Sequence, residues 1–504
     1  MKIGLFLHRS FAYVGHELAV ILKKKYGIRD FCGYVQTRDS YEFLKNQKEI
    51  EYSSLLLDED VQKRYKSEAL DMAYLKNLEM EYGLPNLWPY IEVDRIIRHG
   101  MFLREYPYNT PPYTHEEMLK ILQVNAKAII NFLDKEKPDF VIFVVAGPLG
   151  GLLLYQIAKK RNIKTFVIMS TRVEHKYSVT DDYNTLTDVE KTYKKIRVNH
   201  RSDDVDVLAS QAFLNRFRSN PLPPSSIDLP QNRPTNREKQ FRFLSPRHIF
   251  RSLGWLGRSW WRYLKDKNKD DYSNIKPWHH VWDKLKRKLR VLIGFDDLYD
   301  KVDFQENFAF YALQLEPEIA SLLFAPFYTD QLYLIKQIAR SLPVGYKLYI
   351  KEHPAMFGFR PRYFYKQIKK IPNAKLINPS VVSTELLKNA KLVVTTTGTA
   401  GWEAILFKKP VITFGRVFYN ILPMVKHCRA IEDLPYLIKE QLENFAHDEQ
   451  ALLDLIAAVY KESADVDMVS IWQLQYGRQV NKEKNKKQLT DLADLIFRKI
   501  KSGQ

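Results

Sequence analysis

The stretch Lys391–Gly415, KLVVTTTGTAGWEAILFKKPVITFG, constrains the fold more than any other part of the chain. Its apolar run Leu392–Val394 predicts a buried parallel strand, and a turn of threonine and glycine follows over residues 395–399. A helical segment around Trp402 comes next, and the apolar residues after Pro410 predict a second strand. The order of strand, tight polar turn, helix and strand predicts a βαβ unit, and open α/β folds bind ligands at such a turn.

The same turn has the composition of a phosphate-binding site. Threonine hydroxyls and the free N–H groups at a helix start donate hydrogen bonds to an anion. Glu403 lies one turn into the helix, so it would reach the hydroxyls of a ligand whose phosphates rest on the turn. We expect Thr399 to cap this helix, and Trp402 takes the capping-box position, which leaves Glu403 available for a ligand. The alternative is an ordinary βαβ unit whose threonines only cap the helix.

Length and composition place the chain among folded proteins with more than one domain. At 504 residues it exceeds the size of a single core, and its hydrophobic content of 45% is that of a globular protein. Two cysteines, Cys32 and Cys428, are too few for a disulfide framework and suit a reducing compartment. The first residues lack a signal-peptide pattern, and no run approaches the roughly 20 apolar residues of a membrane span. We therefore expect a cytoplasmic protein.

Strands and helices alternate in both halves of the sequence. Apolar runs such as Lys2–Leu7, Asp139–Val145 and Phe308–Leu313 predict buried strands, and helical patterns separate them. This rhythm predicts an α/β fold with two Rossmann-like, doubly wound domains, a basic tryptophan-rich insertion and a helical C-terminal tail. The expected divisions are an acceptor-side domain (1–219), the insertion (220–300), a nucleotide-sugar domain (301–430) and C-terminal helices (431–504).

The formal net charge of +19 calls for an anionic partner or surface, and it is unevenly distributed. Residues 235–290 hold 16 Lys and Arg against 5 Asp and Glu, together with five of the eight tryptophans. Within Ser245–Lys267, apolar and basic residues separate onto two sides of a predicted helix, which is typical of a helix in an anionic membrane interface. The alternatives are a helix packed on its own protein and, without any recognition motif, a nucleic-acid contact. The apolar side has Ile249, Leu253, Leu256, Trp260 and Leu264, and the basic side has Arg247, Arg251, Arg258, Arg262 and Lys265.

Three loops of the second half follow predicted strands at their carboxyl ends: Gln314–Glu318, Lys351–Pro354 and Thr395–Thr399. Because these ends share one edge of a parallel sheet, the loops are expected to converge on one ligand. His353, held before a proline, would donate a hydrogen bond to a phosphate oxygen, with Lys351 as a cation beside it. A surface histidine is the alternative.

Four segments of the second half carry a family resemblance. Ala312–Glu318 (ALQLEPE), Tyr328–Gln331 (YTDQ), Lys351–Pro354 (KEHP) and Thr395–Pro410 resemble the bacterial capsule polysaccharide biosynthesis proteins, a family related to the β-Kdo transferases. The resemblance covers Phe308–Pro423, under a quarter of the chain. It implies a GT-B glycosyltransferase fold, with a nucleotide sugar (CMP- or UDP-linked) in the C-terminal domain and the acceptor facing the N-terminal domain. The donor-binding residues that follow from it are Gln314, Glu316, Lys351, His353, Thr396, Thr397, Gly398, Thr399 and Glu403.

The activity expected from this resemblance is sugar transfer to a growing surface polysaccharide or lipid-linked glycan at the inner face of the plasma membrane. The N-terminal domain would supply a general base, for which Glu174, His175, Asp181 and His16 are the candidates. No metal is expected, because both Asp-x-Asp sequences lie in polar stretches predicted to be helical, and no cofactor is expected beyond the nucleotide sugar. Two alternatives stay open: a nucleotide-sugar epimerase of the same fold, and a non-catalytic protein that binds glycans or nucleic acid.

Overall fold

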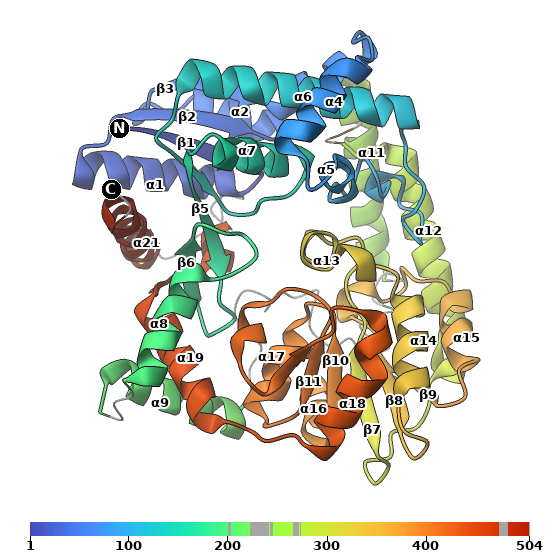
Figure 1. Ribbon diagram of the computed structural model, residues 1–504. Coiled ribbons are helices and arrows are strands. Elements are labelled where there is room, and N and C mark those ends of the chain that lie inside the picture. Colours follow the sequence, from blue (N-terminus) through green and yellow to red (C-terminus); the bar gives the residue numbers. More distant parts are fainter. Residues whose placement is uncertain are drawn as a thin grey trace.

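Two β-sheets organise the chain, and helices pack on both faces of each sheet (Figure 1). The computed structural model describes residues 1–199, 203–221, 241, 245–265, 272, 274–472 and 482–502. One sheet has seven strands, six of them from the first 180 residues, and the other has six strands from residues 308–427. The predicted α/β fold class with two Rossmann-like sheets is confirmed.

The seven-stranded sheet has the order β13-β6-β5-β4-β1-β2-β3. Its first five strands in the chain run parallel, as their apolar runs predict. The strands β6 and β13 differ from the expected doubly wound pattern, because both pair antiparallel with their neighbours. The few residues between β5 and β6 cannot form a crossover helix, so the chain turns back as a hairpin. The strands are β1 (Lys2–Leu7), β2 (Asp30–Val35), β3 (Tyr52–Leu57), β4 (Phe140–Phe143), β5 (Lys164–Ser170), β6 (Lys176–Thr180) and β13 (Ser463–Asp465).

The helices of this half follow the predicted pattern in part. The sequence predicts a capping box of Thr114 and Glu117, and the structure has it at the start of α6. The sequence also predicts a single helix over residues 60–80, which is wrong, because Asp71 accepts a hydrogen bond from the backbone N–H of Tyr74 and so starts a second helix. The helices are α1 (Phe11–Tyr26), α2 (Arg38–Lys45), α3 (Asp58–Lys63), α4 (Met72–Tyr82), α5 (Trp88–Glu92), α6 (His115–Glu136) and α7 (Leu149–Lys160), with short 3-10 helices at Arg64–Lys66 and Met101–Leu103.

The six-stranded sheet is entirely parallel and has the order β12-β11-β10-β7-β8-β9. The chain first adds β8 and β9 on one side of β7 and later adds β10, β11 and β12 on its other side. The strand order therefore reverses between β7 and β10. In open α/β sheets this switch point is where ligands bind. The strands are β7 (Phe308–Ala312), β8 (Lys347–Lys351), β9 (Ala374–Ile377), β10 (Leu392–Thr395), β11 (Val411–Thr413) and β12 (Val425–His427).

Helices cover this second sheet on both faces. From the sequence, Ser383 is expected to cap a helix over Ser383–Asn389, which is wrong: the capping position is Val382, and the Ser383 hydroxyl instead accepts a hydrogen bond from Lys351. The helices are α13 (Ile319–Phe324), α14 (Gln331–Ser341), α15 (Arg362–Lys369), α16 (Ser383–Asn389), α17 (Thr399–Leu406) and α18 (Leu434–Glu443), with 3-10 helices at Asp296–Leu298, Pro326–Tyr328, Pro354–Met356, Phe418–Ile421 and Ile431–Asp433.

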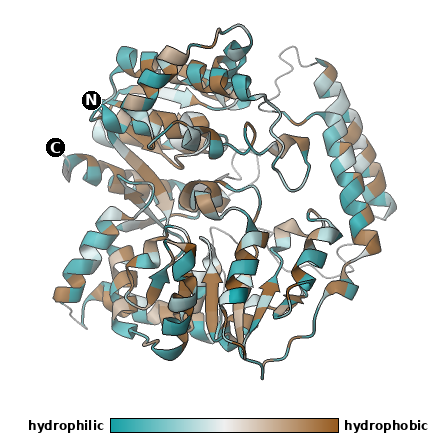
Figure 2. Ribbon diagram, turned by 45° about the vertical axis from the view of Figure 1, so that its right-hand side comes forward, coloured by the Kyte–Doolittle hydropathy of each residue, from teal (hydrophilic) through white to brown (hydrophobic). Residues whose placement is uncertain are grey.

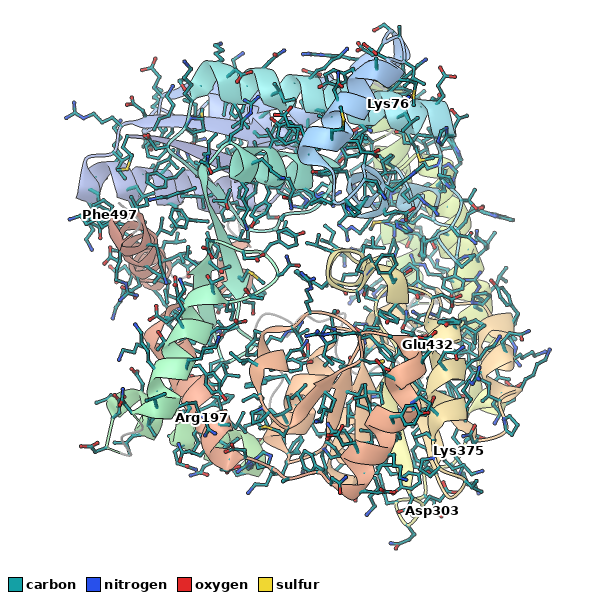
Figure 3. The ribbon with its side chains drawn as sticks, viewed as in Figure 1. Lys76, Arg197, Asp303, Lys375, Glu432 and Phe497 are labelled. Carbon is teal, nitrogen blue, oxygen red and sulfur yellow. The ribbon has the colours of Figure 1, made fainter. Side chains whose placement is uncertain are left out.

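The two sheets are tied together by helices from distant parts of the sequence. The helices α8 (Thr187–Val198), α9 (Val205–Ser219) and α19 (Glu449–Lys461) pack on one another, and their apolar residues join the core of the second sheet. Arg197 on α8 pairs with Asp448 at 3.0 Å (Figure 3). The chain then returns to the first sheet through β13, α20 (Met468–Trp472) and α21 (Lys482–Ser502). The prediction of a helix over residues 465–467 is therefore wrong, because Asp465 ends the edge strand β13.

The insertion forms a two-helix hairpin along one side of the molecule (Figure 2). Its helices are α11 (Pro246–Lys265) and α12 (Pro277–Ile293). The side chain of Tyr272, between them in sequence, is buried in the core of the first sheet and donates a 3.3 Å hydrogen bond to Asp94. At the other end, Arg290 on α12 donates to the carbonyl groups of Gly358 and Phe359 in the second domain. None of the helices that the structure describes is both long and apolar enough to cross a membrane.

Candidate functional site

The three predicted loops share one edge of the second sheet. Gln314–Glu318 follows β7, and the residues that follow β8 and β10 flank it on either side because these strands are the neighbours of β7. The loop after β10 and the loop after β7 thus border the switch point of the sheet. The strands that carry the three loops are neighbours in the sheet, as the prediction of converging loops requires.

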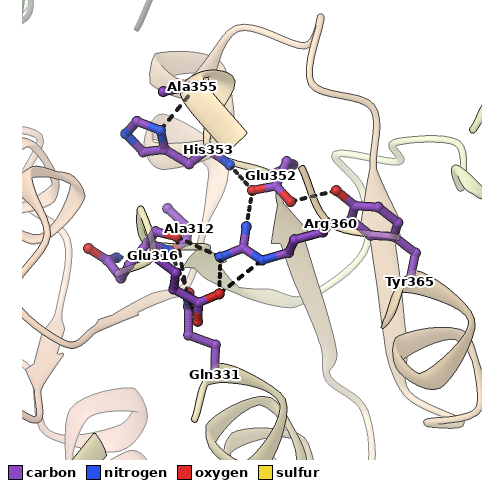
Figure 4. A network of polar contacts seen from close by, with 9 residues as sticks. Ala312, Glu316, Gln331, Glu352, His353, Ala355, Arg360 and Tyr365 are labelled. Atoms are coloured by element: carbon purple, nitrogen blue, oxygen red, sulfur yellow. Dashed lines mark hydrogen bonds and ion pairs between the residues drawn. The ribbon is translucent and has the colours of Figure 1, made fainter. Parts of the chain in front are cut away.

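A buried arginine holds two of these loops together (Figure 4). The side chain of Arg360 is fully buried; its Nη2 donates to Glu316 Oε2 at 2.9 Å and to the carbonyl of Gln314 at 2.7 Å. Its Nη1 donates to Glu352, whose other carboxylate oxygen accepts a 2.6 Å hydrogen bond from the hydroxyl of Tyr365. The burial of two carboxylates around one guanidinium therefore fixes the loops after β7 and β8 relative to each other.

This network changes the roles expected of Gln314 and Glu316. Glu316 also accepts a hydrogen bond from Gln331, so both of its carboxylate oxygens are occupied within the protein. The amide Nε2 of Gln314 donates to the carbonyl of Ala312 at 2.9 Å. Glu316 therefore positions the loop, and its carboxylate is not available to bind a nucleotide sugar. Sequence reasoning missed Arg360, which has no motif of its own and could be suspected only as an arginine among apolar residues.

The geometry of His353 assigns its proton. Its Nδ1 accepts a 3.2 Å hydrogen bond from the backbone N–H of Ala355, so in the neutral ring the proton lies on Nε2. Burial lowers the pKa of His353, and the charges of Arg360 and Lys351 lower it further while Glu352 opposes them. His353 is therefore a neutral imidazole that presents an Nε2–H donor at neutral pH.

The turn after β10 is held in place by close contacts to its glycines. The N–H of Gly398 donates to Thr395 Oγ1 at 3.0 Å, and the carbonyl of Gly398 accepts from the hydroxyl of Tyr419 at 3.1 Å. A Cβ at Gly398 would lie 2.7 Å from Thr395 Oγ1, so a larger residue does not fit there. The capping position of α17 is Gly398, which corrects the prediction for Thr399: the latter is the first residue of the helix. In the part of the chain that the structure describes, the buried hydroxyl of Thr396 has no hydrogen-bond partner.

Lys351 and Glu403 influence each other's charge at this edge of the sheet. Burial lowers the pKa of Lys351 to about 8, while the charge of Glu403 opposes this shift. Burial raises the pKa of Glu403 to about 7, and the charges of Lys351 and Arg172 oppose it. Both groups therefore titrate near neutral pH and respond readily to a charged ligand.

The N-terminal domain contributes cations to this region. Arg172 lies in the hairpin loop after β5; burial raises the pKa values of Glu318 and Glu403 in the opposite domain, and the charge of Arg172 opposes this rise. Arg95 acts on Glu318 in the same way, and on the imidazole of His8, whose pKa falls to about 3 mainly through burial and then through Arg9 and Arg95. Sequence reasoning missed Arg95 and treated Arg172 only as part of its loop.

The predicted bases of the first domain divide among several places. The carboxylate of Glu174 accepts hydrogen bonds from Arg216 at 2.6 Å and from the hydroxyl of Tyr460 at 2.7 Å, so it ties the hairpin loop to α9 and α19. Among the described residues, the buried Nδ1 of His175 has no hydrogen-bond partner. The main-chain carbonyl of His175 accepts from the N–H of Val466.

Asp181 and His16 are likewise engaged within the first domain. Asp181 accepts a 2.6 Å hydrogen bond from the hydroxyl of Thr187. His16, buried on α1, places its Nδ1 3.1 Å from the hydroxyl of Tyr52 and its Nε2 3.8 Å from Glu49. None of these contacts connects either residue with the second sheet, so the structure does not bring the four predicted bases together.

A cavity of about 420 Å³ opens between the two domains. It lies beside the loop after β7, and Gln314, Glu318 and Thr396 line it. His353, Lys351 and Glu403 are not among its lining residues. Of the predicted donor residues, Gln314, Glu316 and Thr396 therefore line this cavity.

The second sheet lies within a segment that matches a known protein family. Residues 296–432 match the family described as capsule polysaccharide biosynthesis protein. The resemblance predicted from the motifs is thereby confirmed for this segment. Protein FixF of Sinorhizobium fredii (strain NBRC 101917 / NGR234) is 33% identical over 133 residues, which are 25% of this chain and 31% of that protein. The chain thus spans about a third of the length of the curated relative it matches.

Solved structures with some likeness to the chain share little sequence with it. The KpsC β-Kdo 2,7 transferase of Thermosulfurimonas dismutans aligns with a TM-score of 0.35 and 12% identity over 70% of this chain and 90% of that chain. The UDP-GlcNAc 2-epimerase of Neisseria meningitidis bound to UDP-GlcNAc aligns with a TM-score of 0.26 and 11% identity over 91% and 94% of the two chains. Both TM-scores are below 0.5, so these structures support no inference about this chain.

Proposed function

We propose that this protein is a metal-independent GT-B glycosyltransferase. It would move a sugar from a CMP- or UDP-sugar to a growing cell-surface polysaccharide or a lipid-linked glycan, with no cofactor beyond the donor. The observation that carries the proposal is the position of the Nε2–H donor of His353 and of the turn Thr396–Thr399 after β8 and β10, the two strands on either side of β7 at the switch point. The match of residues 296–432 to the capsule polysaccharide biosynthesis family supports it.

The proposed chemistry is stabilisation of a departing nucleotide phosphate. The helix α17 would offer its first N–H groups to the phosphate, as helix N-termini do for anions. His353 would donate from Nε2, and Lys351 and Arg172 would supply positive charge where the phosphate becomes more negative. Glu403 would accept hydrogen bonds from the hydroxyls of the ribose or of the sugar. These fixed cations would do the electrostatic work that a metal ion does in other transferases.

A ligand screen followed by one substitution tests this proposal. We expect CMP or UDP and their sugars to raise the melting temperature of the protein. His353→Ala should lower the rate of donor turnover at least 10-fold, since it removes a charge-stabilising donor. The exposed His115→Ala on α6 serves as the control and should leave the rate unchanged. Turnover of His353→Ala within a few-fold of the wild-type rate would contradict the proposal, and an isomerised nucleotide sugar formed without acceptor would indicate an epimerase.

We also propose that the hairpin of α11 and α12 docks on the anionic inner face of the plasma membrane. Seven apolar residues of α12 recur at helical spacing and are exposed to solvent. The helix α11 has no buried residue at all among those described, and Trp260 on it meets Trp278 on α12 with 6.4 Å between ring centroids. The exposed apolar residues are Ile249, Phe250, Leu253, Trp260, Trp261 and Leu264 on α11, and Trp278, Val281, Trp282, Leu285, Leu289, Leu292 and Ile293 on α12.

The positive charge of the hairpin indicates which kind of partner its apolar surface binds. The basic residues of α11 lie beside its apolar face, and α12 adds Lys284, Lys286, Arg287, Lys288 and Arg290. Each basic residue near an anionic leaflet contributes on the order of 1 kcal/mol, and burial of the apolar face adds to this. An anionic lipid surface therefore fits both properties of the hairpin, and no nucleic-acid partner is proposed.

Flotation with liposomes tests the membrane proposal. Trp261→Ser with Trp282→Ser should reduce binding to vesicles of phosphatidylglycerol and phosphatidylethanolamine, because it removes one large apolar side chain from each helix. Tyr436→Ser, which changes an equally exposed aromatic residue on α18, should leave binding unchanged. Unchanged flotation of the double variant would refute docking through the hairpin, and a shift from dimer to monomer would show that a second copy covers the hairpin instead.

A further inference from the structure

The cavity between the domains has the lining of a carbohydrate site. Five aromatic rings border it: Tyr106 and Tyr108 from the first domain, and Tyr328, Tyr363 and Phe364 from the second. The rings of Tyr106 and Phe364 meet edge to face with 5.7 Å between centroids, so the aromatic wall is continuous across the domains. Its volume of about 420 Å³ falls in the usual range for sites that bind small molecules, roughly 300–1,000 Å³. Flat apolar rings suit the C–H faces of sugar rings, whose hydroxyls then need polar partners.

One carboxylate of this cavity differs from the others in its contacts. Glu92 pairs with Arg98 at 2.8 Å, Glu316 belongs to the buried network, and Asp330 accepts the N–H of Tyr333 at 3.0 Å. Glu318 lines the same cavity, and within the described part of the chain no hydrogen bond or ion pair engages its carboxylate. It is therefore the carboxylate of the cavity that can accept a proton from a ligand without first losing an internal partner.

Glu318 also shares the cavity with one residue of the proposed donor site. Burial raises the pKa of Glu318, and the charges of Arg95 and Arg172 oppose that rise and favour the carboxylate form. Thr396, from the turn proposed to bind the donor phosphate, lines the same cavity. The cavity therefore extends from Glu318 to this turn.

We propose that the aromatic cavity binds the acceptor glycan and that Glu318 is the catalytic base, an inference that rests on the proposed transferase function. The Glu318 carboxylate takes the proton of the acceptor hydroxyl, while the oxygen of that hydroxyl forms a bond to the anomeric carbon of the donor sugar. The bond from that carbon to the nucleotide phosphate breaks, and the phosphate leaves with the electron pair. Glu318 then releases the proton to water. Of the first-domain residues expected to serve as base, none lines this cavity.

The test separates acceptor binding, proton transfer and donor binding. The probes are p-nitrophenyl glycosides of glucose, galactose, mannose and rhamnose, with UDP-GlcNAc and CMP-Kdo as donors. Glycoside binding is measured by saturation-transfer NMR, and the rate by acceptor-dependent release of nucleotide. Tyr363→Ala, which removes a half-exposed ring of the cavity wall, should weaken glycoside binding at least fivefold and raise KM with little change in kcat.

Glu318→Gln should lower kcat by a factor of about 10²–10⁴, the usual contribution of a general base, while glycoside and nucleotide affinities stay within threefold. In the wild type kcat should fall as the pH drops through the pKa of Glu318, because the protonated acid cannot accept a proton, and the residual rate of Glu318→Gln should lose this dependence. Glu318→Asp should restore part of the rate. Glu385→Gln, an exposed glutamate on α16, is the matched control and should behave as the wild type.

Each failure points to a different error. If the wild type binds none of the nucleotides or donors, the transferase proposal fails, whereas glycoside binding that is lost in Tyr363→Ala would still support the cavity as a glycan site. Unchanged glycoside binding in Tyr363→Ala would overturn the acceptor site. Wild-type kcat in Glu318→Gln, or a glycosyl group found by mass spectrometry as an ester on Glu318, would overturn its role as base.

Discussion

At the scale of single residues, the site depends on side chains that no motif announces. The histidine before Pro354 and the threonine turn could be predicted because each follows an apolar strand that is plain in the sequence. Arg360 could not, because its partners Glu316 and Glu352 lie 44 and 8 residues away and only the fold brings them together. Glu318 was visible within the ALQLEPE segment, but only the structure shows that its carboxylate has no partner among the described residues.

Arg360 gives the sharpest prediction at this scale. Arg360→Gln should lower the free energy of unfolding by about 3–5 kcal/mol, because it leaves the buried carboxylates of Glu316 and Glu352 without their counter-charge. The matched control is Arg362→Gln, which breaks a partly exposed pair with Asp297 and should cost about 0–1 kcal/mol. Urea denaturation of both variants checks this. Equal losses in the two variants would mean that the network contributes no more than a surface ion pair.

At the scale of elements, the βαβ unit over residues 391–415 was predictable nearly throughout, because each part has a local cause. An apolar run gives β10, the tight turn needs a glycine, and Pro410 ends the helical region before β11. Predictions failed where the cause is not local. The edge strand β13 exists because β6 offers it a partner, and the segment before it contains no apolar alternation that would announce a strand.

The close packing of α17 on β10 leads to a prediction about Gly401. A Cβ at this position would lie 2.5 Å from the hydroxyl of Tyr419 and 2.8 Å from Thr395 Cγ2, so Gly401→Ala forces the helix away from the strand. We expect a loss of about 1–3 kcal/mol in stability and weaker nucleotide binding, since the turn moves with the helix. Gly257→Ala on α11, where no described atom beyond its chain neighbours and the backbone of its own helix lies within 4 Å of the added carbon, should instead be neutral or stabilise by roughly 0.5–1 kcal/mol. Calorimetry with and without nucleotide distinguishes the two, and an unaffected Gly401→Ala would show that the helix can shift freely.

At the scale of the whole molecule, the chain builds two cores that do not follow sequence order. The last helix, α21, packs against α1 at the opposite end of the sequence, where Phe497 stacks on Tyr26 with 3.7 Å between ring centroids (Figure 3). The two ends of the chain therefore complete the first sheet together, while the second sheet closes between them. A helical tail could be predicted from periodicity, but its docking site could not, because an apolar stripe does not specify which surface will cover it.

Two substitutions of matched size test whether these cores unfold as separate units. Ile496 on α21 and Ile335 on α14 are both fully buried, the first in the core of the first sheet and the second in that of the six-stranded sheet. Ile496→Ala and Ile335→Ala should each cost about 2–5 kcal/mol through the cavity they leave. In hydrogen exchange, the amides of α1, β6 and β13 should lose protection in Ile496→Ala, while those of β7, β8 and β10 keep it. In Ile335→Ala, the amides of β7, β8 and β10 should lose protection, while those of α1, β6 and β13 keep it. The helices α8, α9 and α19 pack on the second core, so their amides should follow Ile335→Ala. Protection lost across both sheets in either variant would mean that these connecting helices couple the two domains into one cooperative unit.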